Sequence, residues 1–162
     1  MPRPVPKPSR EEKRQMRSAS RLFAVQALFQ MEQSGAGMDR VREEFETHRF
    51  GREMDGDTYQ EGDVDLFRAT LSKAIEAQAE IDQATDRALV ERWPLGKIDP
   101  TLRALFRAAG AEIMGKGTPP KVVITEYVDV AKAFFPDGKE SRFVNAVLDH
   151  MAREIQPEAF AG

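Results

Sequence analysis

Apolar residues recur along most of the chain at the three- and four-residue spacing of helices that bury one face. This spacing predicts one helix over each of the ranges 10–33, 38–50, 100–115, 120–134 and 141–155. A further helical stretch over 63–91 breaks into two near Glu80–Asp82. Seven helices without a convincing strand predict an all-α fold.

Glycine and proline mark the ends of these helices. The segment 51–62 is rich in glycine and acids, which predicts a loop. The β-branched run Val122–Thr125 alone favours a strand, but its apolar residues continue along one helical arc after a Pro-Pro start, which favours a helix. We expect a disordered proline-rich tail over 1–9, a single helical domain over 10–156 and a short tail over 157–162.

The first predicted helix has two different halves. Its N-terminal half has four arginines spaced four, three and four residues apart, which places them in one stripe: Arg10, Arg14, Arg17 and Arg21. The residues from Leu22 to Met31 are apolar around most of the helix, which is typical of a central core helix. The sequence therefore predicts a basic rod anchored by its C-terminal half.

Two interpretations of the arginine stripe stay open. Like charges in a row repel each other unless an anion lies along them, and a phosphate backbone is such an anion. Alternatively, the stripe is a solvated helix end whose arginines pair with Glu11, Glu12 or the acidic second helix. The net charge of -3 does not reflect this local excess of positive charge, because ten acids lie within residues 39–65.

Composition excludes several classes of site. The 162 residues include no cysteine, which excludes disulfide scaffolds, thiolate metal sites and cysteine nucleophiles. No apolar run is long enough for a membrane span, and prolines replace the apolar stretch of a signal peptide. We therefore expect a cytoplasmic protein.

Motifs for catalysis are weak. His48 and His150 lie far apart without metal-ligand spacing. The segment Gly110–Gly117 nearly matches a phosphate-binding loop but follows a helix and has glycine where serine or threonine should bind magnesium, so we interpret it as a helix C-terminus. Glu126 and Asp129 share one helix face, which we interpret as solvated. We predict no enzymatic activity, no cofactor and no metal.

The last predicted helix begins with an unusual set of side chains. Lys139 and Arg142 lie at the helix start, where the helix dipole favours acids. Phe143 lies beside them at the edge of the apolar arc. It either packs in the core or stacks on an unpaired base.

Five segments resemble, in order, motifs of the NusB family of bacterial transcription antitermination factors: RSASRLFAVQALFQME, DVDLFRATL, RALFRAAGAEIM, PPKVVITEYVDVAKAFF and RFVNAVLD. The resemblance extends from about Arg14 to Glu154. Thr125 and Ala146 replace an asparagine and a glycine of the family pattern. Each motif is common, but their combination in this order is specific.

The resemblance implies a seven-helix fold of two packed helical subdomains, without a cofactor. It also implies binding of boxA-type single-stranded RNA together with NusE, a ribosomal small-subunit protein, in the RNA polymerase antitermination complex that acts during ribosomal RNA synthesis. The oligomeric state stays open between monomer and homodimer.

The resemblance also assigns residues to two surfaces. One surface would bind RNA through the start of the first helix and the start of the last: Arg10, Arg14, Arg17, Arg21, Lys139, Arg142 and Phe143. The other would bind NusE through the third to fifth helices: Asp65, Arg68, Arg87, Leu102 and Arg103. Leu102 also lies on the apolar arc of its own helix.

One departure from the family keeps other functions open. Ser18, Ala19 and Ser20 dilute the usual arginine run, so affinity for RNA alone is expected to be weak. A second hypothesis is therefore a helical protein-interaction module with weak or no RNA binding. A third, the NusB-like domain of a ribosomal RNA methyltransferase, is disfavoured because the chain ends at Gly162 without a cofactor-binding domain.

Overall fold

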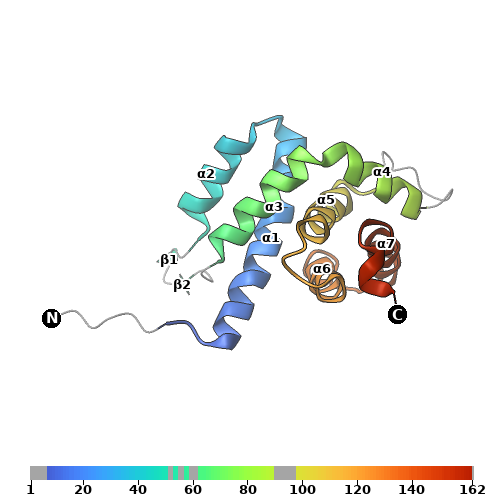
Figure 1. Cartoon of the computed structure of the whole chain (residues 1–162). Coiled ribbons are helices and arrows are strands. Elements are labelled where there is room, and N and C mark those ends of the chain that lie inside the picture. Colours follow the sequence, from blue (N-terminus) through green and yellow to red (C-terminus); the bar gives the residue numbers. More distant parts are fainter. Residues whose placement is uncertain (1–6, 51–52, 55–56, 59–61, 90–97, 162) are drawn as a thin grey trace.

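The computed structural model describes residues 7–50, 53–54, 57–58, 62–89 and 98–161. Helices dominate this part of the chain, which confirms the predicted all-α class (Figure 1). They are α1 (Arg10–Ser34), α2 (Met38–His48), α3 (Val64–Glu76), α4 (Gln78–Leu89), α5 (Pro100–Gly115), α6 (Pro120–Phe134), α7 (Ser141–Ile155) and the short 3-10 helix η3 (Pro157–Phe160). None of the helices in the described residues is long and apolar enough to cross a membrane.

The structure adds local detail to the predicted elements. Two short antiparallel strands of two residues each, β1 (Glu53–Met54) and β2 (Asp57–Thr58), lie in the expected loop and leave the all-α class unchanged. The third and fourth helices separate at Ala77, slightly before the expected break. The expected C-terminal tail contains η3, and Arg153 stacks over the ring of Phe160 there.

The expected N-terminal tail lies mostly outside the described residues. Its last residue, Ser9, is the N-cap of α1 and accepts a hydrogen bond from the backbone N–H of Glu12. Glu11 and Glu12 lie in the first turn, where the helix dipole favours acids. The start of α1 is therefore well defined by local interactions.

The helices form two packed groups. In Figure 1, α1, α2 and α3 lie on one side, and α4, α6 and α7 lie on the other. Helix α5 contacts α1 and α3 of the first group as well as all three helices of the second. This arrangement matches the expected two helical subdomains, with α5 shared between them.

Helix α5 is the central core helix. Its buried residues surround most of the helix and include Leu105, Phe106 and Ile113. The sequence had predicted that the second half of α1 is the central core helix. In the structure, Leu22 and Met31 of that half are only half-buried and Phe29 is exposed. That half packs on α5 along one side and leaves the other side accessible.

Helix α1 is anchored near its middle by the start of α3. Ser20 donates a hydrogen bond from Oγ to the backbone oxygen of Asp63 over 2.6 Å. The backbone N–H of Asp63 donates to the backbone oxygen of Met16 over 3.2 Å. Residues Arg10 to Gln15, before this anchor, are exposed, so the N-terminal part of α1 extends beyond the packed bundle (Figure 1).

Gly110 provides a test of the packing around α5. A Cβ atom at this position would lie 2.6 Å from Cγ2 of Ile81 and 3.3 Å from Cε of Met151. We expect Gly110→Ala to lower the free energy of unfolding, because overpacking costs about 1–3 kcal/mol, more than the helix-propensity gain of at most about 1 kcal/mol.

The matched control is Gly115→Ala, at the end of the same helix, where an added Cβ meets no atom within 4 Å. Denaturant titration of both variants measures the difference. A Gly110 variant as stable as the Gly115 variant would contradict this account of the core.

Candidate nucleic-acid interface

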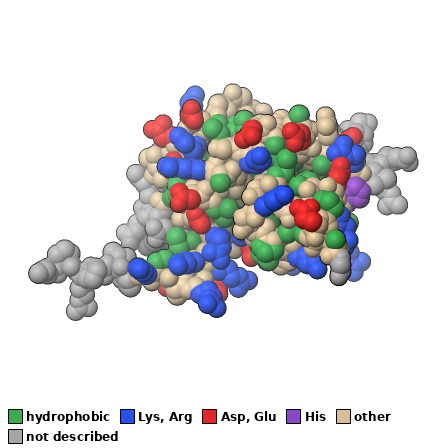
Figure 2. Space-filling model, viewed as in Figure 1, with side chains coloured by type: hydrophobic (Ala, Val, Ile, Leu, Met, Phe, Trp, Pro, Cys, Tyr) green, Lys and Arg blue, Asp and Glu red, His purple; other side chains and the backbone are tan. Residues whose placement is uncertain are grey.

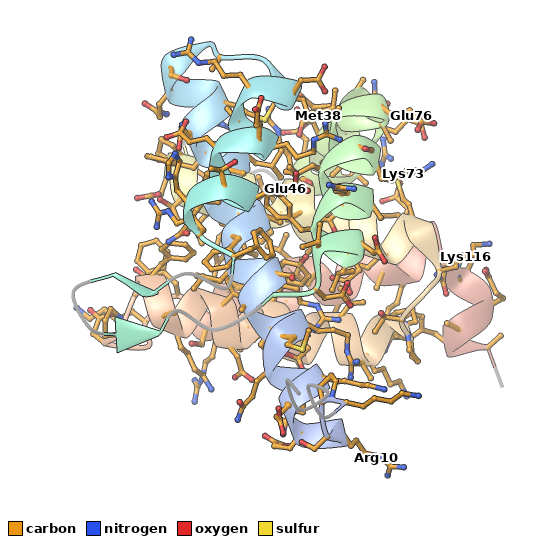
Figure 3. The ribbon with its side chains drawn as sticks, turned by 90° about the vertical axis from the view of Figure 1, so that its left-hand side faces the viewer. Arg10, Met38, Glu46, Lys73, Glu76 and Lys116 are labelled. Atoms are coloured by element: carbon orange, nitrogen blue, oxygen red, sulfur yellow. The ribbon has the colours of Figure 1, made fainter. Side chains whose placement is uncertain are left out.

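The N-terminal part of α1 presents a cluster of basic side chains. Arg10, Lys13 and Arg14 are exposed and Arg17 is half-buried. The side chain of Arg14 is 63% exposed and lies 3.7 Å from Glu11, a weak surface ion pair that matches the solvated-helix interpretation. Figure 2 shows Lys and Arg side chains gathered over this end of the molecule, and Figure 3 shows Arg10 at the end of α1 opposite Met38 and Glu76.

Arg21 does not belong to this exposed cluster, so its predicted place in the stripe was wrong. Only 3% of Arg21 is exposed. Its Nε lies 3.0 Å from both carboxylate oxygens of Glu112, and its Nη2 lies 2.7 Å from Oε1 of that residue. The helix turns Arg21 toward α5, where a buried glutamate holds the guanidinium in a two-pronged pair.

Further polar groups complete the surroundings of this buried pair. Nη1 of Arg21 lies 3.5 Å from Oε2 of Glu126 on α6, and Ser18 donates from Oγ to the same oxygen over 3.0 Å. Thr118 donates to Oε1 of Glu112 over 3.3 Å. Glu126 is therefore not on a solvated face, as its helical pattern had suggested.

The network explains the pKa shifts of its members. Burial alone would lower the pKa of the Arg21 guanidinium, but its hydrogen bonds to Glu112 and the negative charges nearby raise it above the usual value. Burial, followed by the charge of Glu112, raises the pKa of Tyr127 well above the usual tyrosine value. Arg21 stays charged and Tyr127 stays neutral, so the interior next to α1 contains a fixed cation between two carboxylates.

The start of α7 presents the second predicted group. Lys139 and Arg142 are exposed, as expected. Phe143 is half-buried and its ring packs edge-on against Phe106, with the centroids 6.1 Å apart. Part of Phe143 thus contributes to the core, while part of it stays accessible beside the two cations.

The predicted surface for the protein partner is only partly exposed. Leu102 is buried at 6% exposure, so its predicted role as an exposed interface residue was wrong and its apolar arc gave the correct placement. Asp65 and Arg68 are exposed on α3, and Arg87 is exposed on α4. The three arginines pair with acids on three different helices: Arg68 with Glu46, Arg87 with Glu154 and Arg103 with Glu32.

An apolar groove that the sequence analysis missed lies along the C-terminal half of α1. It has a volume of about 450 Å³, and its walls include Phe29, Phe45, Phe134 and Thr101. Phe29 is 36% exposed, one of the few large apolar residues with such exposure among those described. The sequence did not indicate that Phe29 is exposed, because the apolar run Leu22–Met31 predicted burial around most of the helix.

Glu112 and Glu126 were also missed as functional positions. Glu112 lies within a run of otherwise small or apolar residues of α5, from Ala108 to Ile113. A single acid in such a run requires a cation or several donors when it is buried. A single acid in an apolar run of α5 could therefore have indicated that one arginine of the stripe faces inward.

Fold and site together define an all-helical protein with an exposed basic helix end, suited to binding a polyanion. The sequence profile of the NusB family matches residues 18–153. The chain therefore belongs to the NusB family, as its motifs had indicated.

Relatives and solved structures agree with this assignment. The transcription antitermination protein NusB of Agrobacterium fabrum is 46% identical over 144 residues, which cover 88% of this chain and 87% of the relative. The protein of the same name from Rhodopseudomonas palustris is 44% identical over 96% of this chain and 92% of the relative. The solved structure of T. maritima NusB superimposes with a TM-score of 0.68 at 27% identity, over 88% of this chain and 95% of that one.

The buried pair of Arg21 with Glu112 gives a stability prediction. We expect Arg21→Met to lower the free energy of unfolding by about 3–5 kcal/mol, because it leaves Glu112 buried without its cation. Denaturant titration at neutral pH measures the loss.

Arg14→Met is the matched control, because it makes the same change on the exposed side of the same helix. We expect it to change stability by less than about 0.5 kcal/mol. Equal effects of the two substitutions would show that the buried pair has no special role in stability.

Proposed function

We propose that this chain is a transcription antitermination factor that binds boxA-type single-stranded RNA together with NusE during ribosomal RNA transcription. The observation that carries the proposal is the exposed basic part of α1, which extends beyond the bundle while its other half is fixed in the core. An RNA backbone is the anion such an extended row of cations suits. The activity is binding rather than catalysis, needs no cofactor and belongs in the cytoplasm with RNA polymerase.

The named relatives support this function. The relatives with 44–46% identity are transcription antitermination proteins. One solved structure with the same fold, with a TM-score of 0.67 over 85% of this chain and 96% of that one, contains the antitermination factors NusB and NusE in complex with double-stranded RNA. At 21% identity that structure supports the fold of this chain; NusE is the protein partner we propose here, whereas the RNA in that complex is double-stranded and the RNA we propose is single-stranded.

We place the RNA on two groups of residues. Arg10, Arg14 and Arg17 bind phosphates along α1, and Lys139 and Arg142 bind phosphates at the start of α7. The accessible part of Phe143 stacks on an unpaired base next to these cations. Arg21 acts indirectly, because its buried ion pairs fix the orientation of α1.

We place the protein partner at the groove around Phe29 rather than at Leu102. An ordinary interface has an apolar centre surrounded by polar groups. The Phe29 groove provides this pattern, with an exposed aromatic ring next to Gln30, Gln33 and Arg49. It also includes Thr101, so it adjoins the start of α5 that the sequence analysis had selected.

One observation favours the alternative of a protein-interaction module. The burial of Arg21 leaves fewer arginines for RNA than the sequence suggested. Ser18, which lies where the family often has arginines, donates a hydrogen bond to Glu126 and provides no positive charge for RNA. A gel-shift measurement with boxA-type RNA, with and without NusE, separates the two functions. Binding only in the presence of NusE, without dependence on Arg17, would favour the alternative.

The salt dependence of RNA binding tests the basic surface. Each phosphate contact on a single strand contributes about 0.7 to the slope of log affinity against log salt. We expect Arg17→Ala to weaken binding and to lower this slope by about 0.7. Arg40→Ala, an exposed arginine on α2, is the control and should leave the slope unchanged. A wild-type slope for the Arg17 variant would place Arg17 off the RNA.

Phe29→Asp tests the groove for the protein partner. A charge at the centre of an apolar interface should weaken NusE binding by at least 2 kcal/mol, about 30-fold, as for other anchor residues. Because Phe29 is partly exposed, the isolated variant should keep the wild-type helical circular dichroism. Leu102→Asp, by comparison, should unfold the protein, because Leu102 is buried. Unchanged NusE affinity of the Phe29 variant would move the partner to another surface.

A further inference from the structure

A second groove lies in the corner where the basic part of α1 meets α6. It has a volume of about 450 Å³, within the range of small-molecule sites, roughly 300–1,000 Å³. Ala19, Leu22, Val130 and Ala133 give it apolar walls.

One wall of the groove provides a fixed hydrogen-bond acceptor. Glu126 lines the groove with 13% of its side chain exposed. Within the described residues, its contacts with Ser18 and Arg21 both use Oε2. These two contacts hold the carboxylate in place, and Oε1 is left to accept a hydrogen bond from a molecule in the groove.

The groove also adjoins the first group of cations in the proposed RNA surface. Arg14 forms part of its rim on α1. On the other side, Ala133 lies one residue before the end of α6, and the short connection that follows leads to Lys139 and Arg142 at the start of α7. A strand bound along the cations of α1 would therefore pass beside the groove.

We propose that this groove holds one unstacked base of the bound RNA and selects a base whose edge has an amino group. Cytosine, adenine and guanine each have such a group, which can donate to Glu126. Uracil has no amino group, and its one edge donor, N3–H, lies between two carbonyl oxygens that the carboxylate of Glu126 repels. The apolar walls contact the faces of the base, as in other single-strand sites. This inference rests on the proposed RNA binding and adds base selectivity to it.

The charged side chains that line the groove favour a neutral base over other occupants. A phosphate is disfavoured, because Glu126 and Asp129 line the groove and the side chain of Asp129 is 58% exposed. A basic protein segment would suit these acids, but Arg14 at the rim of the groove would repel it. A neutral base attached to a phosphate backbone suits both the acids in the groove and the cations around it.

The experiment compares short RNA strands with the full chain at low salt. The probes are an oligouridylate and three versions of it in which one central uridine is replaced by cytidine, adenosine or guanosine. We expect at least one replacement to tighten binding by roughly 5- to 100-fold, the usual range for a well-placed contact to a base edge. The strand can slide on the cations, so the replaced base can reach the groove.

Two variants test whether this preference comes from the groove. Glu126→Gln removes one charged acceptor while Arg21 keeps its contacts with Glu112. Ala133→Leu fills the groove from an exposed position without changing any charge. We expect both to bring the affinity ratio between replaced and unreplaced strands close to one. Ala79→Leu, an exposed alanine on α4, is the control and should keep the wild-type ratio.

Each result has a defined meaning. A wild-type ratio near one, or an unchanged ratio in Ala133→Leu, overturns the base site. If Arg17→Ala still lowers the salt slope in that case, the proposed RNA binding stands. A failure of every strand to bind at low salt, in the presence of NusE as well as in its absence, overturns both. If Ala133→Leu weakens NusE binding and leaves the ratio unchanged, the groove belongs to a protein segment and the inference is wrong.

Discussion

The buried ion pair between Arg21 and Glu112 is the interaction on which the rest of the structure depends. It joins α1 to the central helix α5, and the contact with Glu126 adds α6. A buried charge without its partner is costly, so few rotations of α1 about its own axis satisfy these groups. The same rotation determines which arginines face outward and which face the core.

This dependence shows what could and could not be predicted from the sequence. Helical periodicity gave the fold class and most helix ends, because those follow from local spacing and from glycine and proline. It also placed Leu102 on a buried arc, which the structure confirms. The assignment of Leu102 to the NusE interface came from the family resemblance. This assignment conflicted with the helical pattern around Leu102, which predicted burial.

Long-range pairing is what the sequence did not reveal. Arg21 and Glu112 are separated by 91 positions, and the spacing of Arg10, Arg14, Arg17 and Arg21 is equally consistent with four exposed arginines. Only the packing of α1 on α5 determines that the fourth one faces inward. The accessible ring of Phe29 and the held carboxylate of Glu126 likewise depend on how α6 lies against α1.

The anchoring of α1 near Met16 and Ser20 has a consequence for how the protein can vary. Positions before the anchor are exposed, so under the proposed placement of the RNA substitutions there alter RNA affinity while the melting temperature stays nearly constant. The buried positions after it, Phe23, Ala24, Val25, Ala27 and Leu28, pack in the core and are constrained together with α5. On the RNA surface proposed above, selection can therefore adjust the strength of RNA binding through the number of cations on this helix end, independently of folding.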